Sequence, residues 1–108
     1  MAGRKRGTTE DKYVRQIHDV LTRQYLPSHP RAKIHPKRYN SVSVRVRIID
    51  PDFAGKSMVQ RDDAAWKDLD TLPADVREEI SWLLLLTPEE VRTSLMNQEF
   101  EDPSPSVL

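Results

Sequence analysis

The residues of this chain that are best placed to do chemistry lie in one short turn. Gly55, Lys56 and Ser57 follow an alternating strand pattern and open a helical one. Backbone amides at the start of a helix, beside a lysine, can hold a phosphate or a carboxylate group. A complete phosphate-binding loop also needs a glycine at position 50, where this chain has Asp50. The simpler interpretation is a tight turn that leads to a helix cap at Ser57, so an NTPase is not expected.

Histidine and cysteine offer little for a metal or redox site. The chain has no cysteine, which excludes disulfides, thiolate ligands and cysteine nucleophiles. His18 lies beside a helical apolar stripe and is expected to be a packed or surface residue. His29 and His35 flank a strand pattern among prolines, and a ligand role is not expected for either. We therefore predict no metal and no cofactor.

Acidic residues are concentrated in the helical stretch from 62 to 79, where only Lys67 and Arg77 oppose them. Their spacing is typical of a solvated helix face rather than of paired catalytic carboxylates. No Ser/His/Asp set with a nucleophile motif and no glycine-rich cofactor loop accompanies them. The chain is therefore not expected to be an enzyme. The acids of this stretch are Asp62, Asp63, Asp68, Asp70, Asp75, Glu78 and Glu79.

Length and composition set the scale on which these residues act. At 108 residues the chain is expected to be one domain, and 37% apolar with 31% charged residues favours a soluble globule. The longest apolar run, Trp82 to Leu86, is far short of a membrane span. No apolar stretch follows the basic start of the chain, so we expect no secretory signal and a cytoplasmic protein.

Charge is distributed very unevenly along the chain. Residues 1–50 hold 12 basic and 4 acidic residues, a balance of +8, and residues 51–108 hold 5 basic and 13 acidic residues, a balance of −8. Such halves either interleave and neutralise each other in space or leave a dipolar surface. Both interpretations stay open at this stage.

Hydrophobic periodicity predicts the element order α-β-β-α-α-β-α. Between a disordered basic arm, 1–8, and a flexible tail, 99–108, we expect a single domain over residues 9–98. Thr8 with Asp11 resembles the start of a helix, and Asn40-Ser41 is a plausible tight turn. The expected elements are a helix over 9–25, strands over 32–39 and 42–49, a helix over 58–70, a short helix from Leu72-Pro73, a strand over 82–86 and a helix over 87–98.

The strand over 42–49 has the clearest alternation in the chain. Val42, Val44, Val46 and Ile48 face one way, whereas Ser43, Arg45 and Arg47 face the other.

The first two strands are close enough to form a hairpin, in which Pro36 restricts the first strand to an edge. The uniformly apolar third strand is reached through a helical crossover, which favours parallel pairing and coverage on both faces. Inward positions of the helices are Val59, Trp66, Leu69, Val76 and Ile80. We predict an α+β fold in which helices cover one face of a three-stranded mixed sheet and the arginine face stays open.

The order of motifs along the chain resembles the BolA family, which has the class II KH-like topology. The family's turn motif, a phenylalanine, Gly-Lys-Ser and then an Arg-His pair, is matched by Phe53, Gly55, Lys56, Ser57 and Arg61. Its aromatic and leucine pair is matched by Trp66 and Leu69. Its last strand and helix start are matched by Ile80, Leu83 to Leu86, Thr87, Pro88, Glu89 and Glu90. The resemblance covers roughly residues 10–97.

Two departures bear on function. The histidine of the Arg-His pair is Asp62 here, and the histidine of the last strand is Ser81. BolA-like proteins are associated with monothiol glutaredoxins, and the strand histidine can ligate a shared [2Fe–2S] cluster. Serine is a poor substitute for imidazole on iron. The resemblance thus implies a monothiol glutaredoxin as a possible partner, without a cluster ligand.

The function that fits these features best is a non-enzymatic BolA-like regulatory or adaptor domain that acts by binding a protein. The alternative is a nucleic-acid-binding module, KH-like or transcription-regulator-like, that uses the basic arm and the open sheet face. Acids at 62–79 and the lack of a KH-type glycine clamp speak against the alternative. A structural subunit of a larger complex is a third possibility. Candidate contacts to nucleic acid or to an acidic partner are Lys37, Arg38, Arg45, Arg47, Lys56 and Arg61.

Overall fold

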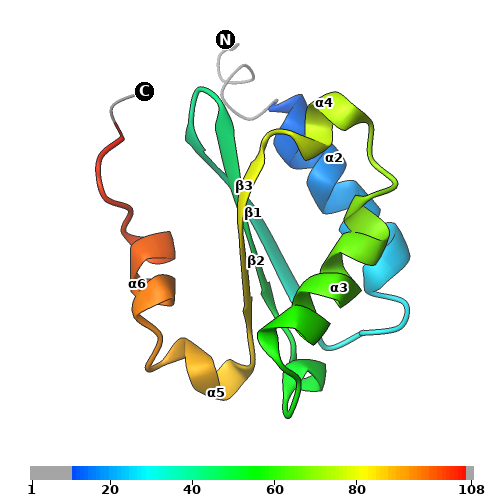
Figure 1. Cartoon of the computed structure of the whole chain (residues 1–108), viewed down its shortest axis with the longest axis vertical. Coiled ribbons are helices and arrows are strands. Elements are labelled where there is room, and N and C mark those ends of the chain that lie inside the picture. Colours follow the sequence, from blue (N-terminus) through cyan, green and yellow to red (C-terminus); the bar gives the residue numbers. More distant parts are fainter. Residues whose placement is uncertain (1–10, 107–108) are drawn as a thin grey trace, which may run out of the picture.

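The computed structural model describes residues 11–106, and the predicted basic arm, with Thr8, lies outside this range. Figure 1 shows the sheet nearly edge-on with helices on both of its sides. The order α-β-β-α-α-β-α is confirmed, except that the last helix is divided in two. The elements are α2 (Lys12–Val20) with the π-helical turn η1 (Leu21–Tyr25), β1 (Lys33–Asn40), β2 (Ser43–Ile49), the 3-10 turn η2 (Pro51–Phe53), α3 (Met58–Leu69), α4 (Ala74–Arg77), β3 (Ile80–Leu86), α5 (Pro88–Val91) and α6 (Leu95–Glu101).

The three strands form a mixed sheet in the order β1-β2-β3. β1 and β2 pair antiparallel and β2 and β3 pair parallel, as predicted. Pro36 lies in β1, an edge strand, where a missing N–H is tolerated. The hairpin turn lies one residue later than predicted, because Asn40 pairs with Ser43. Val42 therefore lies in the turn, 53% exposed, and not on the buried face of β2.

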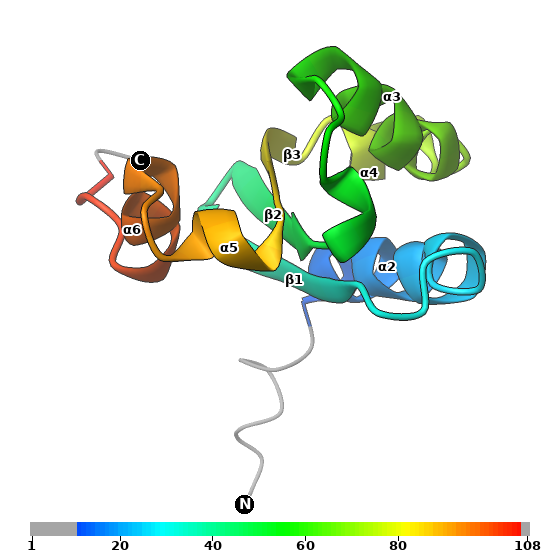
Figure 2. The same cartoon turned by 90° about the horizontal axis from the view of Figure 1, so that it is seen from below.

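The main core lies between the sheet and the helices α2, α3 and α4, which lie together on the same side of the sheet (Figures 1 and 2). Val44, Val46 and Ile48 point into it and are fully buried. Val59 was expected to face this core, but it is 70% exposed at the start of α3. Helical core residues include Ile17, Leu21, Tyr25, Ala65, Leu69 and Val76.

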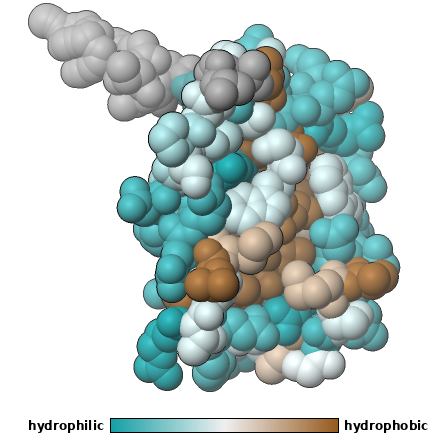
Figure 3. Space-filling view, turned by 60° about the vertical axis from the view of Figure 1, so that its left-hand side comes forward, coloured by the Kyte–Doolittle hydropathy of each residue, from teal (hydrophilic) through white to brown (hydrophobic). Residues whose placement is uncertain are grey.

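The other face of the sheet is covered, so the prediction of an open arginine face is wrong. α5 and α6 lie on this side (Figures 1 and 2). Phe100 packs with Leu84 and Leu86 in a second buried cluster. The apolar run of β3 is thus covered on both faces, as its composition predicted. Figure 3 turns this side forward and shows hydrophobic surface in its middle, bordered by hydrophilic side chains.

The segment expected to be a flexible tail, 99–108, begins inside α6 and makes hydrogen bonds to β1. α6 continues to Glu101, three residues beyond the predicted helix end at 98. After it, the backbone N–H of Ser104 donates to Glu99, and the hydroxyl of Tyr39 donates to the Ser104 carbonyl. Residues 107 and 108 lie outside the described range.

Local signals place the turns and helix starts. Gly55 has φ +78°, a conformation that favours glycine, and Ser57 begins α3 with a complete capping box. A second capping box joins Thr87 and Glu90 at the start of α5. Asp11 caps α2 by accepting hydrogen bonds from two backbone N–H groups. Ile80 was expected to lie on the preceding helix, but it begins β3.

Among residues 11–106, no helix is both long and apolar enough to cross a membrane.

Candidate functional site

Two of the predicted nucleic-acid contacts, Arg45 and Arg47, form hydrogen bonds with side chains of α6. Arg47 is 8% exposed and donates to Asn97 and Glu101 of α6. Its hydrogen bond to Glu101 is the main cause that lowers the pKa of that carboxyl. Arg45 donates to Glu99 at 2.9 Å. Glu99 and Glu101 of α6 lie over the sheet face that carries Arg45 and Arg47, so each arginine is paired with an acid of the same chain.

Among the other candidate cations, Lys37 lies on the same face as Arg45, its partner in the ladder, whereas Arg38 does not. Lys37 donates to the carbonyl of Phe100, on the α6 side. Arg38 pairs with Val44 in the ladder and reaches the opposite side, where Asp11 and Glu79 accept from it.

Arg61 and Lys56 have different surroundings. The guanidinium of Arg61 is 6% exposed and makes a two-pronged ion pair with Glu90, which holds the pKa of that carboxyl below its usual value. Lys56 is exposed in the turn. Of the six candidate contacts, Lys37 and Lys56 are exposed and make no ion pair within residues 11–106, and Lys37 is held by the Phe100 carbonyl.

The family-like turn motif has a structural role in this chain. Phe53 is buried in the main core and Gly55 makes the tight turn. Ser57 caps α3, and Arg61 donates back to the carbonyl of Lys56 at 3.1 Å. These contacts bind the turn to the first helical turns of α3. The capping box occupies two of the N–H groups at this end of the helix, those of Ser57 and Gln60.

A different region combines exposure, aromatic side chains and free backbone groups. A groove of about 230 Å³ lies between α3 and β3. Trp66 and Asp62 line it from α3, and Ser81 and Leu83 from β3. Asp62 and Ser81, the two departures from the resemblance noted in the sequence, both line this groove. We call this surface the β3 groove; its lining residues are Asp62, Trp66, Ile80, Ser81, Trp82 and Leu83.

The strand that forms one wall of the β3 groove is an edge of the sheet. β3 pairs with β2, and no other described strand pairs with it. The backbone N–H of Asp50 donates to the Leu86 carbonyl, so the carbonyl of Leu86 points toward β2. Because the direction alternates along a strand, the carbonyls of Leu85 and Leu83 point outward. The outward carbonyl of Leu85 accepts from Arg61. The backbone N–H and carbonyl of Leu83 point outward too, and no hydrogen-bond partner for them lies within residues 11–106.

Two features shorten this free edge. The register shifts between β2 and β3 at Val44 and Arg45, which leaves Ser81 as an extra, bulged residue. Toward the C-terminal end of β3, the guanidinium of Arg61 occupies the carbonyl of Leu85. The available stretch is therefore centred on Leu83, which suits a short extended segment and discourages open-ended strand addition.

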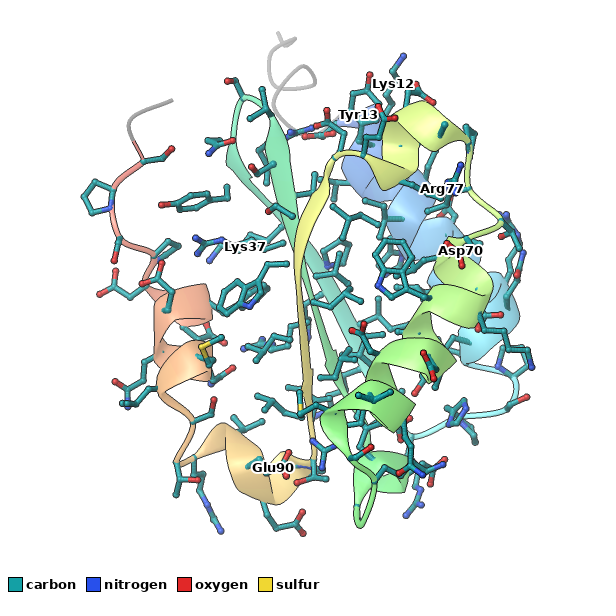
Figure 4. All side chains as sticks on the ribbon, viewed as in Figure 1. Lys12, Tyr13, Lys37, Asp70, Arg77 and Glu90 are labelled. Atoms are coloured by element: carbon teal, nitrogen blue, oxygen red, sulfur yellow. The ribbon has the colours of Figure 1, made fainter. Side chains whose placement is uncertain are left out.

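A second hollow, of about 260 Å³, adjoins the β3 groove at Trp66. Asp70 and Glu78 line it together with Arg77. The Nε atom of Arg77 is buried and has no hydrogen-bond partner within residues 11–106. Figure 4 shows Arg77 and Asp70 on the α3–α4 side of the molecule. A donor of this kind can satisfy an acceptor supplied by a bound segment.

A cluster that the sequence does not indicate lies at the C-terminal end of β2. His29 Nδ1 lies 3.2 Å from an Asp50 oxygen and 3.0 Å from an Asp52 oxygen. Asp50 is fully buried and accepts from the hydroxyl of Tyr25 at 2.7 Å. Burial, and then this hydrogen bond to Asp50, raise the pKa of the Tyr25 hydroxyl. The hydrogen bond from His29, and next the one from Arg31, lower the pKa of Asp52.

This cluster joins a loop and a turn that are distant in sequence. The Asp50-Pro51-Asp52 break was visible in the sequence, but nothing there indicated that the loop before β1 returns to it.

Comparison with protein-family models, curated proteins and solved structures gives no match for this chain.

Proposed function

We propose that this chain is a non-enzymatic, BolA-like regulatory or adaptor domain that binds a short extended, basic segment of a partner protein in the β3 groove. The observation that carries the proposal is the outward backbone of Leu83 beside the half-buried ring of Trp66, which lines the groove. Backbone hydrogen bonds to an edge strand provide affinity, and side-chain pockets provide specificity.

Charge around the groove supports a basic occupant. Asp62 lines the β3 groove, and Asp70 and Glu78 line the adjoining hollow. Arg77 contributes a buried donor, which suits a backbone carbonyl of the bound segment. Trp66 stands between the two hollows, where it can contact aliphatic stems or the charged ends of lysine and arginine.

The replacement of both family histidines directs the proposal toward a peptide and away from a shared iron–sulfur cluster. Asp62 and Ser81 supply a carboxylate and a hydroxyl in the groove. These are poor ligands for cluster iron. A monothiol glutaredoxin remains a partner to test, with contact through the groove and without a cluster.

The pairing of two arginines makes the sheet face less suited to nucleic-acid binding. Such binding needs cations that are free to neutralise phosphates. Arg45 and Arg47 are instead paired with α6, and the β3 groove is bordered by acids. Oligonucleotides therefore serve as a comparison in the test below.

The proposal is tested with labelled model peptides and fluorescence anisotropy. One probe alternates lysine and valine, a second alternates glutamate and valine, and a third is a short mixed-sequence RNA. Two charge reversals make a matched pair: Asp62→Lys alters the β3 groove, and Asp63→Lys alters the next exposed residue of α3, which does not line it.

We expect the lysine–valine peptide to bind more tightly than the other two probes. Asp62→Lys should weaken it by roughly tenfold, because a like charge replaces an attractive one at the contact, whereas Asp63→Lys should change it much less. Equal effects of the two variants, or a preference for RNA, would reject the groove as the site.

A further inference from the structure

We propose that His29, Asp50 and Asp52 form a binding site for a divalent transition-metal ion, with Zn²⁺ as the best fit. His29 comes from the loop between η1 and β1, Asp50 follows β2, and Asp52 lies in η2. One possible ligand atom from each lies within 4.8 Å of the others. An imidazole nitrogen with two carboxylate oxygens is a donor set that zinc accepts. The inference is independent of the β3 groove.

Two of the three distances between donor atoms are close to those of a tetrahedral metal site. His29 Nδ1 lies 3.2 Å from Asp50 Oδ2 and 3.0 Å from Asp52 Oδ2. In a tetrahedral zinc site with bonds of about 2.0 Å, neighbouring ligand atoms are about 3.3 Å apart. The side chains of His29 and Asp52 are 25% and 37% exposed, which leaves a path for the metal and a fourth position for water.

The charge of Asp50 is an independent reason to expect a cation here. Asp50 is fully buried, and a buried carboxylate is costly unless a positive charge lies near it. Its other partners, the Tyr25 hydroxyl and the backbone N–H of Asp52, are neutral. Among the described residues, His29 is the ionisable base that pairs with it, whereas Arg31 pairs with Asp52. A divalent ion at this point would balance both carboxylates.

Neighbouring contacts already hold the three ligands in place. The Tyr25 hydroxyl donates to the same Asp50 oxygen that would bind the metal. The ring of His29 stacks on that of Tyr25, with centroids 4.1 Å apart and planes inclined by 11°. Contacts of this kind orient metal ligands and fix the histidine ring. Tyr25 itself ends a π-helical turn, an irregularity that is often found at functional sites.

The test is a titration of the full chain with Zn²⁺ by calorimetry and with Co²⁺ by visible absorption. His29→Ala and Asp52→Asn each remove one ligand that is partly exposed, so both variants should fold. His18→Ala is the matched control, because His18 is an exposed histidine on α2 outside the cluster. Circular dichroism establishes that all variants are folded.

We expect one Zn²⁺ per chain and intense tetrahedral Co²⁺ bands. Both cluster variants should weaken zinc binding at least about tenfold and lose the cobalt bands, whereas His18→Ala should bind like the wild type. Absence of binding at millimolar zinc would overturn the assignment. So would unchanged binding in His29→Ala, or an equal loss in His18→Ala.

Discussion

Tyr25 joins the helical layer to the end of β2 through a single hydroxyl. It is 1% exposed and donates to the buried carboxylate of Asp50 at 2.7 Å. Removing this hydroxyl takes the nearer of two partners from a buried carboxylate oxygen and leaves His29 Nδ1 at 3.2 Å. We expect Tyr25→Phe to lower the free energy of unfolding by about 1–3 kcal/mol, measured by urea denaturation.

Tyr39→Phe provides the control for this prediction. Its hydroxyl donates to the Ser104 carbonyl at 2.7 Å, but the bond is exposed to solvent. Water can replace the lost partner there, so the variant should cost less than about 1 kcal/mol. Equal losses in Tyr25→Phe and Tyr39→Phe would show that the burial of Asp50 does not determine the effect.

The sequence determined the direction of individual side chains only where the ladder register was secure. Val44, Val46 and Ile48 alternate inward as predicted, but Val42 falls in the turn because the hairpin closes one residue later. Arg38 pairs with Val44 and therefore lies on the opposite face of the sheet from Arg45. The sequence could not show this, because the face of Arg38 depends on the register between β1 and β2.

At the scale of elements, α6 is a structural layer of the fold. Phe100 is 3% exposed, packs with Leu84 and Leu86, and lies 4.6 Å from the Arg47 guanidinium, measured to the ring centroid. Phe100→Ala should lower the free energy of unfolding by about 3–5 kcal/mol. Leu95→Ala, on the same helix but 77% exposed, should change it by less than about 0.5 kcal/mol. Denaturant titration of both variants checks this, and similar losses would contradict it.

The arginines under α6 give a second test at this scale. An open sheet face predicts that Arg45→Ser with Arg47→Ser leaves folding intact. With α6 in place, the double change removes partners of Asn97, Glu99 and Glu101. We now expect it to cost about 2–4 kcal/mol by thermal or urea unfolding. A double variant as stable as the wild type would mean that α6 does not depend on these contacts.

One signal in the sequence already pointed to α6 as a cover. A strand that is apolar on both faces needs a layer on each side, and Trp82 to Leu86 is such a strand. Leu84 and Leu86 share a face with Arg47 in the parallel ladder. The acids and prolines after residue 98 concealed the continuation of α6, because they are equally typical of a loose tail.

At the scale of the whole molecule, ion pairs should make stability depend on pH. Arg38 lowers the pKa of Asp11, and Arg61 lowers that of Glu90. A carboxyl whose folded pKa is lowered stabilises the fold above its unfolded value and loses that contribution as the pH falls through the folded value. The affected carboxyls, with ordinary values of 3.8 for aspartate and 4.5 for glutamate, are Asp11, Asp52, Glu90, Glu99 and Glu101.

We therefore expect the urea midpoint to fall steadily between about pH 5 and about pH 3. Glu90→Gln provides the control. It should start less stable, because Arg61 loses its charged partner, but its acid-side decline should be shallower. A midpoint that stays constant or rises over this range would contradict the pairing.

Charge asymmetry along the chain is resolved by the topology. Basic residues of β1 and β2 meet acidic residues of α6, as in the pairs of Arg45 with Glu99 and Arg47 with Glu101. The sequence left this interleaving and a dipolar surface as equal options. The α+β class and the mixed sheet could be predicted from periodicity, whereas the β3 groove and the His29 cluster could not, because each joins segments that only the tertiary fold brings together.

The most direct test of the proposed function is an amide NMR titration of the whole chain with the lysine–valine peptide and, separately, with short mixed-sequence RNA. The account predicts that the peptide shifts the signals of residues 81–84 and the indole N–H of Trp66. Asp62→Lys should require roughly tenfold more peptide for the same shifts, while Asp63→Lys should respond much like the wild type. It predicts no response of the groove to RNA. Salt-sensitive RNA shifts over residues 37–47, with the groove silent toward the peptide, would contradict it.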